Sequence, residues 1–336
     1  MPVEIEEEDY SPCDLQSPPE AKAETVTLKV PVSLSGSRLD QVLVEMLPEF
    51  SRSRLAALAK AGNVTVDGIL GLPKTKLFGG EEIQATLMPR EAEMAFLPED
   101  LPLNVLFEDD ALLVIDKQAG LVVHPGAGNW SGTLLNALLF RNPTVAELPR
   151  AGIVHRLDKE TSGVMVVAKT EAAQLSLVRQ LQSRTVKRIY VALVRGHPPQ
   201  DGVVEKPIGR HPHHRTKMAV VGEDEGQGGK IAVTHFRLVQ RFPHHSLLEC
   251  QLETGRTHQI RVHMQSIGFP IEGDQVYSPG AVGVNAATRD VFRRFGRQAL
   301  HARKLTFDHP VHGESVTFEA PVPADMRELI DVVAAL

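Results

Sequence analysis

The stretch RAGIVHRLDKETSGVMVVAKT, residues 150–170, places one conspicuous carboxylate between two cations. Asp158 lies between Arg156 and Lys159 in a loop-like run, and the apolar run 163–169 that follows predicts a buried strand. Reactive side chains tend to lie on loops that a rigid scaffold holds in place. A surface aspartate in an ordinary turn gives the same pattern, so the choice depends on the rest of the chain.

The composition of the 336 residues is that of a globular protein with an acidic tail. Hydrophobic residues make up 42% of the chain, enough to bury a sizeable core. Residues 1–24 carry eight acidic residues and one lysine, so the tail contributes −7 to the net charge of −6 and the remainder is near +1. We expect residues 1–25 to be disordered, and the overall negative charge does not exclude a nucleic-acid ligand for the rest.

Cysteine usage and hydropathy bound the class of protein. Cys13 and Cys250 lie far apart in unlike contexts, which argues against a disulfide framework and against a cysteine-rich zinc site. The chain opens MPVEIEEEDY and contains no run of about 18 apolar residues, so neither a signal peptide nor a membrane span is predicted. We therefore expect a cytoplasmic protein with no membrane partner.

Turn signals and periodicity divide the chain after the tail. Residues 26–90 predict a small α/β domain with a helix from about Arg38, a second helix within 51–62, and two short strands. Residues 91–103 are predicted to be a linker at the start of a second domain, 91–336, in which strands and helices mix without regular βαβ alternation. The expected fold class is α+β, with a mixed or antiparallel sheet rather than a doubly wound one.

Basic side chains gather in two places. A helix whose apolar stripe faces the core can offer its cationic face to phosphates, although a solvated helix surface is the alternative for any single residue. On or beside the two predicted helices of the small domain lie Arg38, Arg52, Arg54 and Lys60. The loop KPIGRHPHHRTKM, 206–218, is predicted either to contact phosphates or to be simply solvated, and its cations include Arg210, Arg215 and Lys217.

Histidines in two segments resemble metal ligands only superficially. His211, His213 and His214 have no acidic residue or cysteine at ligand spacing. His258 and His263 in THQIRVH lack the i, i+4 spacing of a zinc-binding helix. No metal site is predicted.

The segment KRIYVALVRG predicts a strand with two unlike faces. Alternation places Tyr190 on the face of Arg188, opposite an apolar face of Ile189, Val191 and Leu193 that we expect to be core. Tyr190 would then lie beside a guanidinium where a cleft can form. A sheet tyrosine with its hydroxyl in water is the alternative.

The segment GRTHQIRVHM predicts a helix whose N-terminus Thr257 can cap. Arg261 lies off the apolar stripe of this helix and can point into a site, or it can pair with a surface acid for little gain. Arg256 lies beside the helix N-terminus, where free N–H groups and the dipole favour an anion such as phosphate. The stripe consists of Ile260, Met264 and Ile267.

Together these segments resemble a known family. GIVHRLDKETSG, KRIYVAL and GRTHQIRVHM, in this order after the small domain, are similar to the motifs of RluA-type pseudouridine synthases, and the resemblance extends over residues 36 to about 330. The small domain, GSRLDQVLVEMLPEFSRSRLAALAKAGNVTVDG, resembles an S4 RNA-binding domain. The resemblance implies an isomerase that turns uridine into pseudouridine in RNA and requires no metal or organic cofactor.

The same resemblance assigns roles to three residues. It implies that Asp158 is the essential aspartate, Tyr190 the active-site tyrosine, and Arg261 the basic residue that pairs with the aspartate. A carboxylate beside C1′ can attack the sugar, stabilise its cationic stage or take a neighbouring proton. An arginine within about 4–6 Å favours its ionised form. Substrate contacts are also expected from Arg156, Thr161 and Arg256.

The predicted function is the isomerisation of specific uridines in large-subunit ribosomal RNA by a monomer whose partner is that RNA or the pre-ribosomal large subunit. One alternative is a synthase for another ribosomal RNA position or for tRNA. Another is a non-catalytic RNA-binding assembly factor, which the intact trio Asp158, Tyr190 and Arg261 disfavours. A glycosidase is disfavoured because no second acid lies at a suitable spacing.

Overall fold

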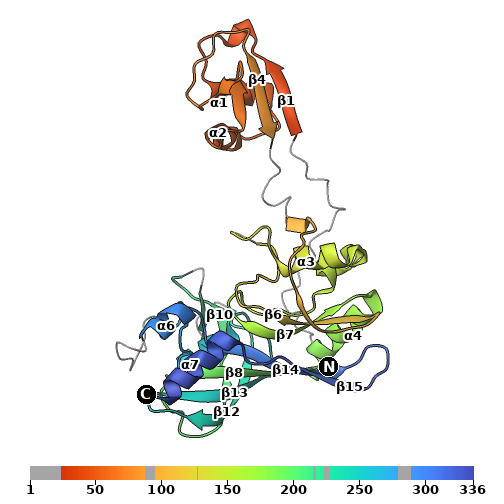
Figure 1. Cartoon of the computed structure of the whole chain (residues 1–336), viewed down its shortest axis with the longest axis vertical. Coiled ribbons are helices and arrows are strands. Elements are labelled where there is room, and N and C mark those ends of the chain that lie inside the picture. The colour runs from red at the N-terminus through yellow and green to blue at the C-terminus, as the bar shows by residue number, and fades with distance from the viewer. Residues whose placement is uncertain (1–23, 88–94, 127, 215–216, 223–227, 279–288) are drawn as a thin grey trace. The chain divides into compact units, whose positions relative to one another are not determined.

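The computed structural model describes residues 24–87, 95–126, 128–214, 217–222, 228–278 and 289–336. Contacts within the chain divide it into two compact units that meet in sequence at Leu97 (Figure 1). Residues 1–23 of the predicted tail and residues 91–94 of the predicted linker lie outside the described residues. The last two residues of the predicted tail, 24 and 25, belong to the first strand. None of the helices in the described part of the chain is long and apolar enough to span a membrane.

The N-terminal unit is a four-stranded sheet with two helices, and its sheet order is β1-β4-β2-β3. Ser51 caps the second helix by accepting a hydrogen bond from the Arg54 amide, and Asp67 and Gly68 make the turn of a hairpin with positive φ at both positions. Leu39, Leu55 and Ile83 are completely buried in its core. The elements are β1 (Glu24–Lys29), the 3₁₀ turn η1 (Val32–Leu34), α1 (Leu39–Met46), α2 (Arg52–Lys60), β2 (Val64–Val66), β3 (Ile69–Leu70) and β4 (Glu82–Leu87).

The larger unit is built on one nine-stranded sheet of order β5-β6-β7-β14-β8-β13-β12-β9, with β15 paired to β14. Among the described strand pairs only β7 and β14 run parallel, so the prediction of an α+β fold with a mixed sheet is confirmed. Its strands are β5 (Asn104–Glu108), β6 (Leu112–Lys117), β7 (Ser162–Ala168), β8 (Lys187–Arg195), β9 (Gly202–Glu205), β12 (Val233–Arg241), β13 (His245–Leu252), β14 (Leu300–Asp308) and β15 (Ser315–Glu319).

Helices and shorter elements complete the larger unit (Figure 1). A two-stranded sheet consists of β10 (Ile208–Arg210) and β11 (Met218–Val220). The helices are α3 (Leu134–Arg141), the 3₁₀ turns η3 (Pro143–Glu147) and η4 (Pro149–Gly152), α4 (Glu171–Gln182), α5 (Gln259–Ser266), α6 (Arg289–Phe295) and α7 (Ala324–Ala334).

The predicted strand after Asp158 is β7, and all seven of its residues are buried. Gly163 stands where β7 runs beside β14: its φ is 124°, and a Cβ atom there would lie 2.2 Å from the carbonyl oxygen of Ala302. Only glycine permits both this backbone and this approach. The motif therefore allows a close approach of two neighbouring parallel strands directly after the loop that carries Asp158.

Three details differ from the predictions. Periodicity predicts Leu175, Val178 and Leu181 as the apolar stripe of α4; Leu181 is buried, but Leu175 is exposed and Leu177 is buried in its place. On β8 both faces are largely buried: Tyr190 is 6% exposed on one face, and Val191 and Leu193 are buried on the other. Thr257 does not cap α5; the helix begins one residue later, with His258 as its N-cap in the left-handed conformation.

Candidate active site

Asp158 lies in the loop between η4 and β7, and its side chain is 18% exposed. The loop is held on both sides of the aspartate: the Thr161 amide donates to the Asp158 carbonyl, and the Gly120 amide donates to the Lys159 carbonyl. Thr161 is buried and its hydroxyl accepts a hydrogen bond from Gln298 at 3.0 Å. Thr161 was expected to contact substrate; buried against Gln298, it instead fixes the loop.

Lys117, at the end of β6, also supports this loop from inside the protein. Its ammonium donates to the carbonyls of Gln118, Leu121 and Lys159 at 2.9, 2.9 and 3.0 Å. Burial lowers the pKa of Lys117 to about 7, against the opposing attraction of Asp158. The position of the Asp158 loop thus depends on three backbone carbonyls gathered around one buried amine.

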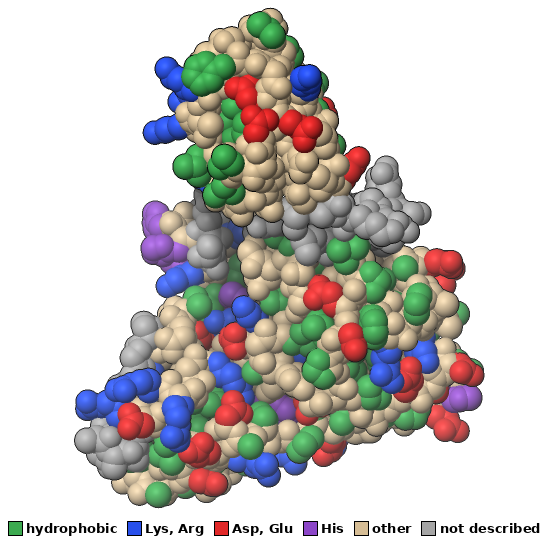
Figure 2. All heavy atoms as spheres, turned by 45° about the horizontal axis from the view of Figure 1, so that its top comes forward, with side chains coloured by type: hydrophobic (Ala, Val, Ile, Leu, Met, Phe, Trp, Pro, Cys, Tyr) green, Lys and Arg blue, Asp and Glu red, His purple; other side chains and the backbone are tan. Residues whose placement is uncertain are grey.

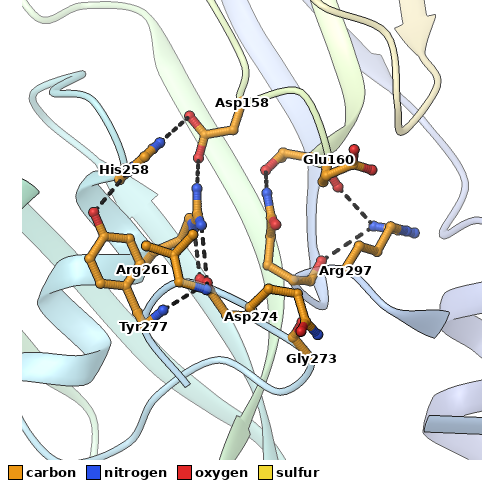
Figure 3. Close-up of polar contacts among 12 residues, drawn as sticks. Asp158, Glu160, His258, Arg261, Gly273, Asp274, Tyr277 and Arg297 are labelled. Carbon is orange, nitrogen blue, oxygen red and sulfur yellow. Dashed lines mark hydrogen bonds and ion pairs between the residues drawn. The ribbon is translucent and has the colours of Figure 1, made fainter. Parts of the chain in front are cut away.

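Arg261, on α5, joins two carboxylates (Figure 3). Its Nη1 donates to Oδ2 of Asp158 at 2.9 Å, while Nε and Nη2 donate to the two oxygens of Asp274 at 2.7 and 3.0 Å. Burial opposes the charge of Arg261, but its bonds to Asp274 and Asp158 raise its pKa above the usual range. The guanidinium is therefore always charged, and its orientation is set by a fork-to-fork pair on the side away from Asp158.

Asp274 is completely buried and is held by more than the arginine. Its Oδ1 also accepts hydrogen bonds from the amides of Val276 and Tyr277 at 2.9 and 3.0 Å. Burial alone would raise the pKa of Asp274, but the hydrogen bonds and charge of Arg261, with the two amides, lower it. Asp274 is thus an ionised anchor, and Asp158 is the carboxylate of the pair that remains partly accessible.

His258 and Tyr277 form the other side of the site (Figure 3). The His258 Nε2 lies 4.0 Å from Oδ1 of Asp158, and its Nδ1 lies 2.8 Å from the Tyr277 hydroxyl. That hydroxyl accepts a hydrogen bond from the Met218 amide, and the Arg261 guanidinium lies over the Tyr277 ring at 5.0 Å. Burial lowers the pKa of His258, although the charge of Asp158 raises it in part.

Tyr190 lies on β8, between β14 and β13, where its backbone faces Ala302 and Cys250. Burial raises the pKa of Tyr190 to about 12, the Arg188 charge lowers it, and the Asp158 charge adds to the rise. The phenol is therefore neutral at physiological pH. It can offer a ring or a hydroxyl, but not a phenolate base.

The remaining predicted contacts in the larger unit are spread out. Arg156 is exposed beside Asp158, and Arg256 is partly exposed with its Nε donating to the Ile231 carbonyl. Arg210 is exposed at the end of β10, and the Lys217 ammonium donates to the Val276 carbonyl at 3.2 Å. Arg215 lies outside the described residues.

In the N-terminal unit the predicted cations are partly engaged with the protein. Arg38 and Arg52 both pair with the buried Asp40, Arg54 lies 4.6 Å over the Phe50 ring, and Lys60 is exposed. On the face shown in Figure 2, basic side chains lie at the edges of this unit. The side chains of the two arginines paired with Asp40 are still substantially exposed, at 39% for Arg38 and 55% for Arg52.

Several residues of the site were not predicted from the sequence. Asp274 and Tyr277 stand three apart in EGDQVY, where an acid and an aromatic residue after a helix signal nothing by themselves. His258 was considered only as a zinc ligand, and Lys117 was not singled out. The sequence feature that could have indicated Lys117 is its position at the end of an apolar strand, shortly before a glycine turn. In the part of the chain that the structure describes, no group of three or more His, Cys, Asp or Glu side chains is arranged to hold a metal ion.

Comparison with protein families and with known proteins gives one consistent result. The family model described as RNA pseudouridylate synthase matches residues 111–266. "Ribosomal large subunit pseudouridine synthase D" of Neisseria meningitidis serogroup A is 52% identical over 97% of this chain and 87% of that protein. The protein of the same name from Nitrosomonas europaea is 53% identical over 93% of this chain and 89% of its own length.

Solved structures agree with the sequence relatives. Human RNA Pseudouridylate Synthase Domain Containing 4 is 26% identical, with a TM-score of 0.54, over 68% of this chain and 92% of that chain. Human RNA Pseudouridylate Synthase Domain Containing 1 is 25% identical, with a TM-score of 0.52, over 71% of this chain and 97% of that chain.

Proposed function

The chain belongs to the RluA-type family of RNA pseudouridine synthases, and from this premise we propose that it isomerises specific uridines of large-subunit ribosomal RNA with Asp158 as the catalytic carboxylate. The observation that carries the role of Asp158 is its pairing. It is the partly accessible member of two carboxylates on one buried guanidinium, Arg261. The ribosomal substrate is supported by relatives about half identical over nearly the whole chain.

The chemistry needs one ionised acid next to C1′ of the target nucleotide. The N1–C1′ bond breaks, the detached uracil turns while bound, C5 bonds to C1′, the C5 proton leaves and N1 takes up a proton, so the product is an isomer of the substrate. Asp158 attacks C1′, stabilises its cationic character, or takes a neighbouring proton. Arg261 orients the carboxylate through its hydrogen bond to Oδ2 of Asp158, and the two bonds from Arg261 to Asp274 fix the position of the guanidinium.

Tyr190 has the properties of a platform for the extruded uracil. Tyr190 projects from a central strand, β8, which holds its ring in place. Burial raises the pKa of Tyr190 to about 12, so the phenol is neutral. A flat aromatic surface stacks on a base without regard to the base's orientation, which suits a uracil that must turn. We assign the hydroxyl a secondary role at most in moving the C5 proton.

Binding must offset the cost of unstacking the target, about a few kcal/mol. In the larger unit we assign phosphate contacts to the exposed Arg156 and Arg210 and to the partly exposed Arg256. Lys217 and Arg215 belong to the same sequence segment as Arg210. In the N-terminal unit we assign RNA contact to residues 26–90, as an S4-like domain, on account of the cations around Asp40 and on α2.

We further propose that the enzyme acts as a monomer in the cytoplasm on ribosomal RNA or on the pre-ribosomal large subunit. In this scheme residues 91–336 form the catalytic domain, and the acidic residues 1–25 precede the RNA-binding domain. No metal or organic cofactor has a step in this chemistry.

Tritium release from RNA labelled at uridine C5 tests the function directly, because forming the C5–C1′ bond expels that hydrogen. Deproteinised large-subunit RNA that lacks the modification should release tritium with the full chain, and mapping should place pseudouridine at discrete positions. Tritium release only from tRNA or only from small-subunit RNA would show that the enzyme acts on that RNA instead. Binding without release from any of these RNAs would identify an assembly factor instead.

A further inference from the structure

The hydrogen bonds around His258 favour one tautomer of its ring. The Met218 amide can only donate, so the Tyr277 hydroxyl accepts from it at 2.9 Å. Among the described residues the phenolic proton has one acceptor within hydrogen-bond distance, Nδ1 of His258 at 2.8 Å, which favours donation to that nitrogen. In this arrangement Nδ1 is the accepting nitrogen of a neutral ring, and Nε2 carries the proton. That N–H faces Oδ1 of Asp158 across 4.0 Å.

The backbone holds the ring in this place at some cost. His258 has φ 57° and ψ 22°, the left-handed region that non-glycine residues seldom occupy, and it makes no side-chain cap bond although it is the N-cap of α5. The next residue, Gln259, is tied by its side chain to the Arg256 amide, to the Thr254 hydroxyl and to the Val233 carbonyl. Strained residues that surroundings fix so firmly cluster at functional sites.

We propose that His258 is a positioning residue whose Nε2–H donates a hydrogen bond to Oδ1 of Asp158 when RNA is bound, in a tautomer that Tyr277 selects. This inference rests on the proposed role of Asp158. The separation of 4.0 Å is longer than a hydrogen bond, and catalytic contacts often shorten only in the complex with substrate. Arg261 already holds Oδ2, so the two donors together fix the plane of the carboxylate and leave one lone pair on each oxygen for the sugar.

A neutral donor suits this position better than a second cation. Two positive groups, Arg261 and Arg156, already act on the ring of His258 through their charge, as do two negative groups, Asp158 and Asp274. The Tyr277 hydroxyl contacts the ring directly, at Nδ1. A positive imidazolium would weaken Asp158 as a nucleophile or base by neutralising it. The imidazole instead keeps its proton throughout, orients the carboxylate and leaves its charge in place.

Two substitutions separate the donor from the rest of the ring. His258→Gln places an amide N–H close to the position of Nε2, whereas His258→Asn tolerates the left-handed backbone but is too short to reach Asp158. We expect H258Q to retain kcat within about threefold and H258N to lose about ten- to a hundredfold in kcat, with KM for RNA unchanged in both. His244→Asn, at an exposed histidine of the β12–β13 turn, is the matched control.

The pH profile distinguishes positioning from proton transfer. Because burial lowers the pKa of His258, its ring is neutral at neutral and alkaline pH, and H258Q should keep the shape of the wild-type kcat profile there. Equal losses in H258Q and H258N, with a limb of the profile removed, would show that His258 transfers a proton and would overturn the proposal. Wild-type rates in H258N would overturn it as well.

The tautomer itself is measured without any turnover. The ¹⁵N resonances of His258 in the full chain should show a bare Nδ1 and a protonated Nε2 near neutral pH, and Tyr277→Phe should weaken that preference. A protonated Nδ1 would overturn the proposal even if H258N failed to fold. Failure of wild-type enzyme to release tritium would instead remove the proposed function and leave the tautomer result standing.

Discussion

Each unit of the molecule contains a group of aspartate and arginine side chains, in opposite proportions. In the larger unit one arginine, Arg261, is shared by two aspartates. In the N-terminal unit one aspartate, Asp40, is shared by Arg38 and Arg52, each through two hydrogen bonds. The first group has a net charge of −1 and the second +1.

Burial decides which charge each group presents to a ligand. The Arg261 side chain is 6% exposed, so the accessible end of its group is the carboxylate of Asp158, 18% exposed. In the other group Asp40 is 6% exposed and the two guanidiniums form the accessible face. The same ion pairing therefore aims an anion at a sugar carbon in one unit and cations at phosphates in the other, as we propose.

Replacing the accessible carboxylate should have the largest effect. Asp158→Asn removes the charge that the reaction needs while keeping shape and one hydrogen-bonding oxygen, so we expect kcat to fall more than about a thousandfold. RNA affinity should stay within a few fold, because the lost group is not a cation. Tritium release and filter binding on the same RNA measure both; substantial residual turnover would reject the assignment of Asp158.

Replacing the buried carboxylate should act through Arg261. Asp274→Asn removes the anchor that orients the guanidinium of Arg261 toward Asp158, and we expect a loss of about a hundredfold in kcat with KM little changed. It also breaks a buried ion pair, which costs on the order of 3 kcal/mol of unfolding free energy. Single-turnover rates and chemical denaturation check the two effects.

Glu272→Gln is the matched control for that experiment. Glu272 is also buried and also pairs with an arginine, Arg195, at 2.7 Å, but it makes no contact with Arg261 in the described structure. We expect a comparable loss of stability with nearly normal kcat at temperatures where the variant is folded. Equal loss of activity in both variants would mean that Asp274 acts through stability alone.

The comparison also shows how far sequence reasoning reaches. The loop of Asp158, the strand after it and a basic partner at Arg261 followed from local motifs and their resemblance to a family. Asp274 did not, because it meets Arg261 only after α5 turns back through residues 267–273, a geometry that side-chain periodicity does not encode.

Asp40, which pairs with arginines from two helices, illustrates the same limit in the N-terminal unit. The sequence indicated Arg38 and Arg52 as cations near a helix, and it also contained Asp40 two residues after the first. It did not show that the N-termini of α1 and α2 lie close enough for both arginines to reach one carboxylate. Local pattern predicted the elements; the sharing of partners between elements required the fold.

Acid should weaken the larger unit through its buried carboxylates, by less than Asp274→Asn does. The folded-state pKa of Asp274 is lowered, so its contribution to stability is present above its unfolded pKa, near 3.9, and is lost as pH falls through the folded value. Urea midpoints of wild type should therefore drop below about pH 4. The Asp274→Asn variant should show a shallower acid dependence, and parallel curves would contradict an ionised Asp274.

The smallest effect is expected at the exposed arginine of the N-terminal group. Arg52→Ala leaves Asp40 paired with Arg38, so the unit should remain folded while one cation is lost from its surface. If Arg52 contacts phosphate in single-stranded RNA, the slope of log affinity against log salt should fall by about 0.7 and affinity by a few fold, with kcat at saturating RNA unchanged. Arg179→Ala, at an exposed position of α4, is the matched control and should leave the slope unchanged. An unaltered slope in R52A would mean that Arg52 and Asp40 stabilise the fold and that Arg52 does not bind RNA. The two Asp–Arg groups would then differ in which charge is buried, but not in the ligand that they contact.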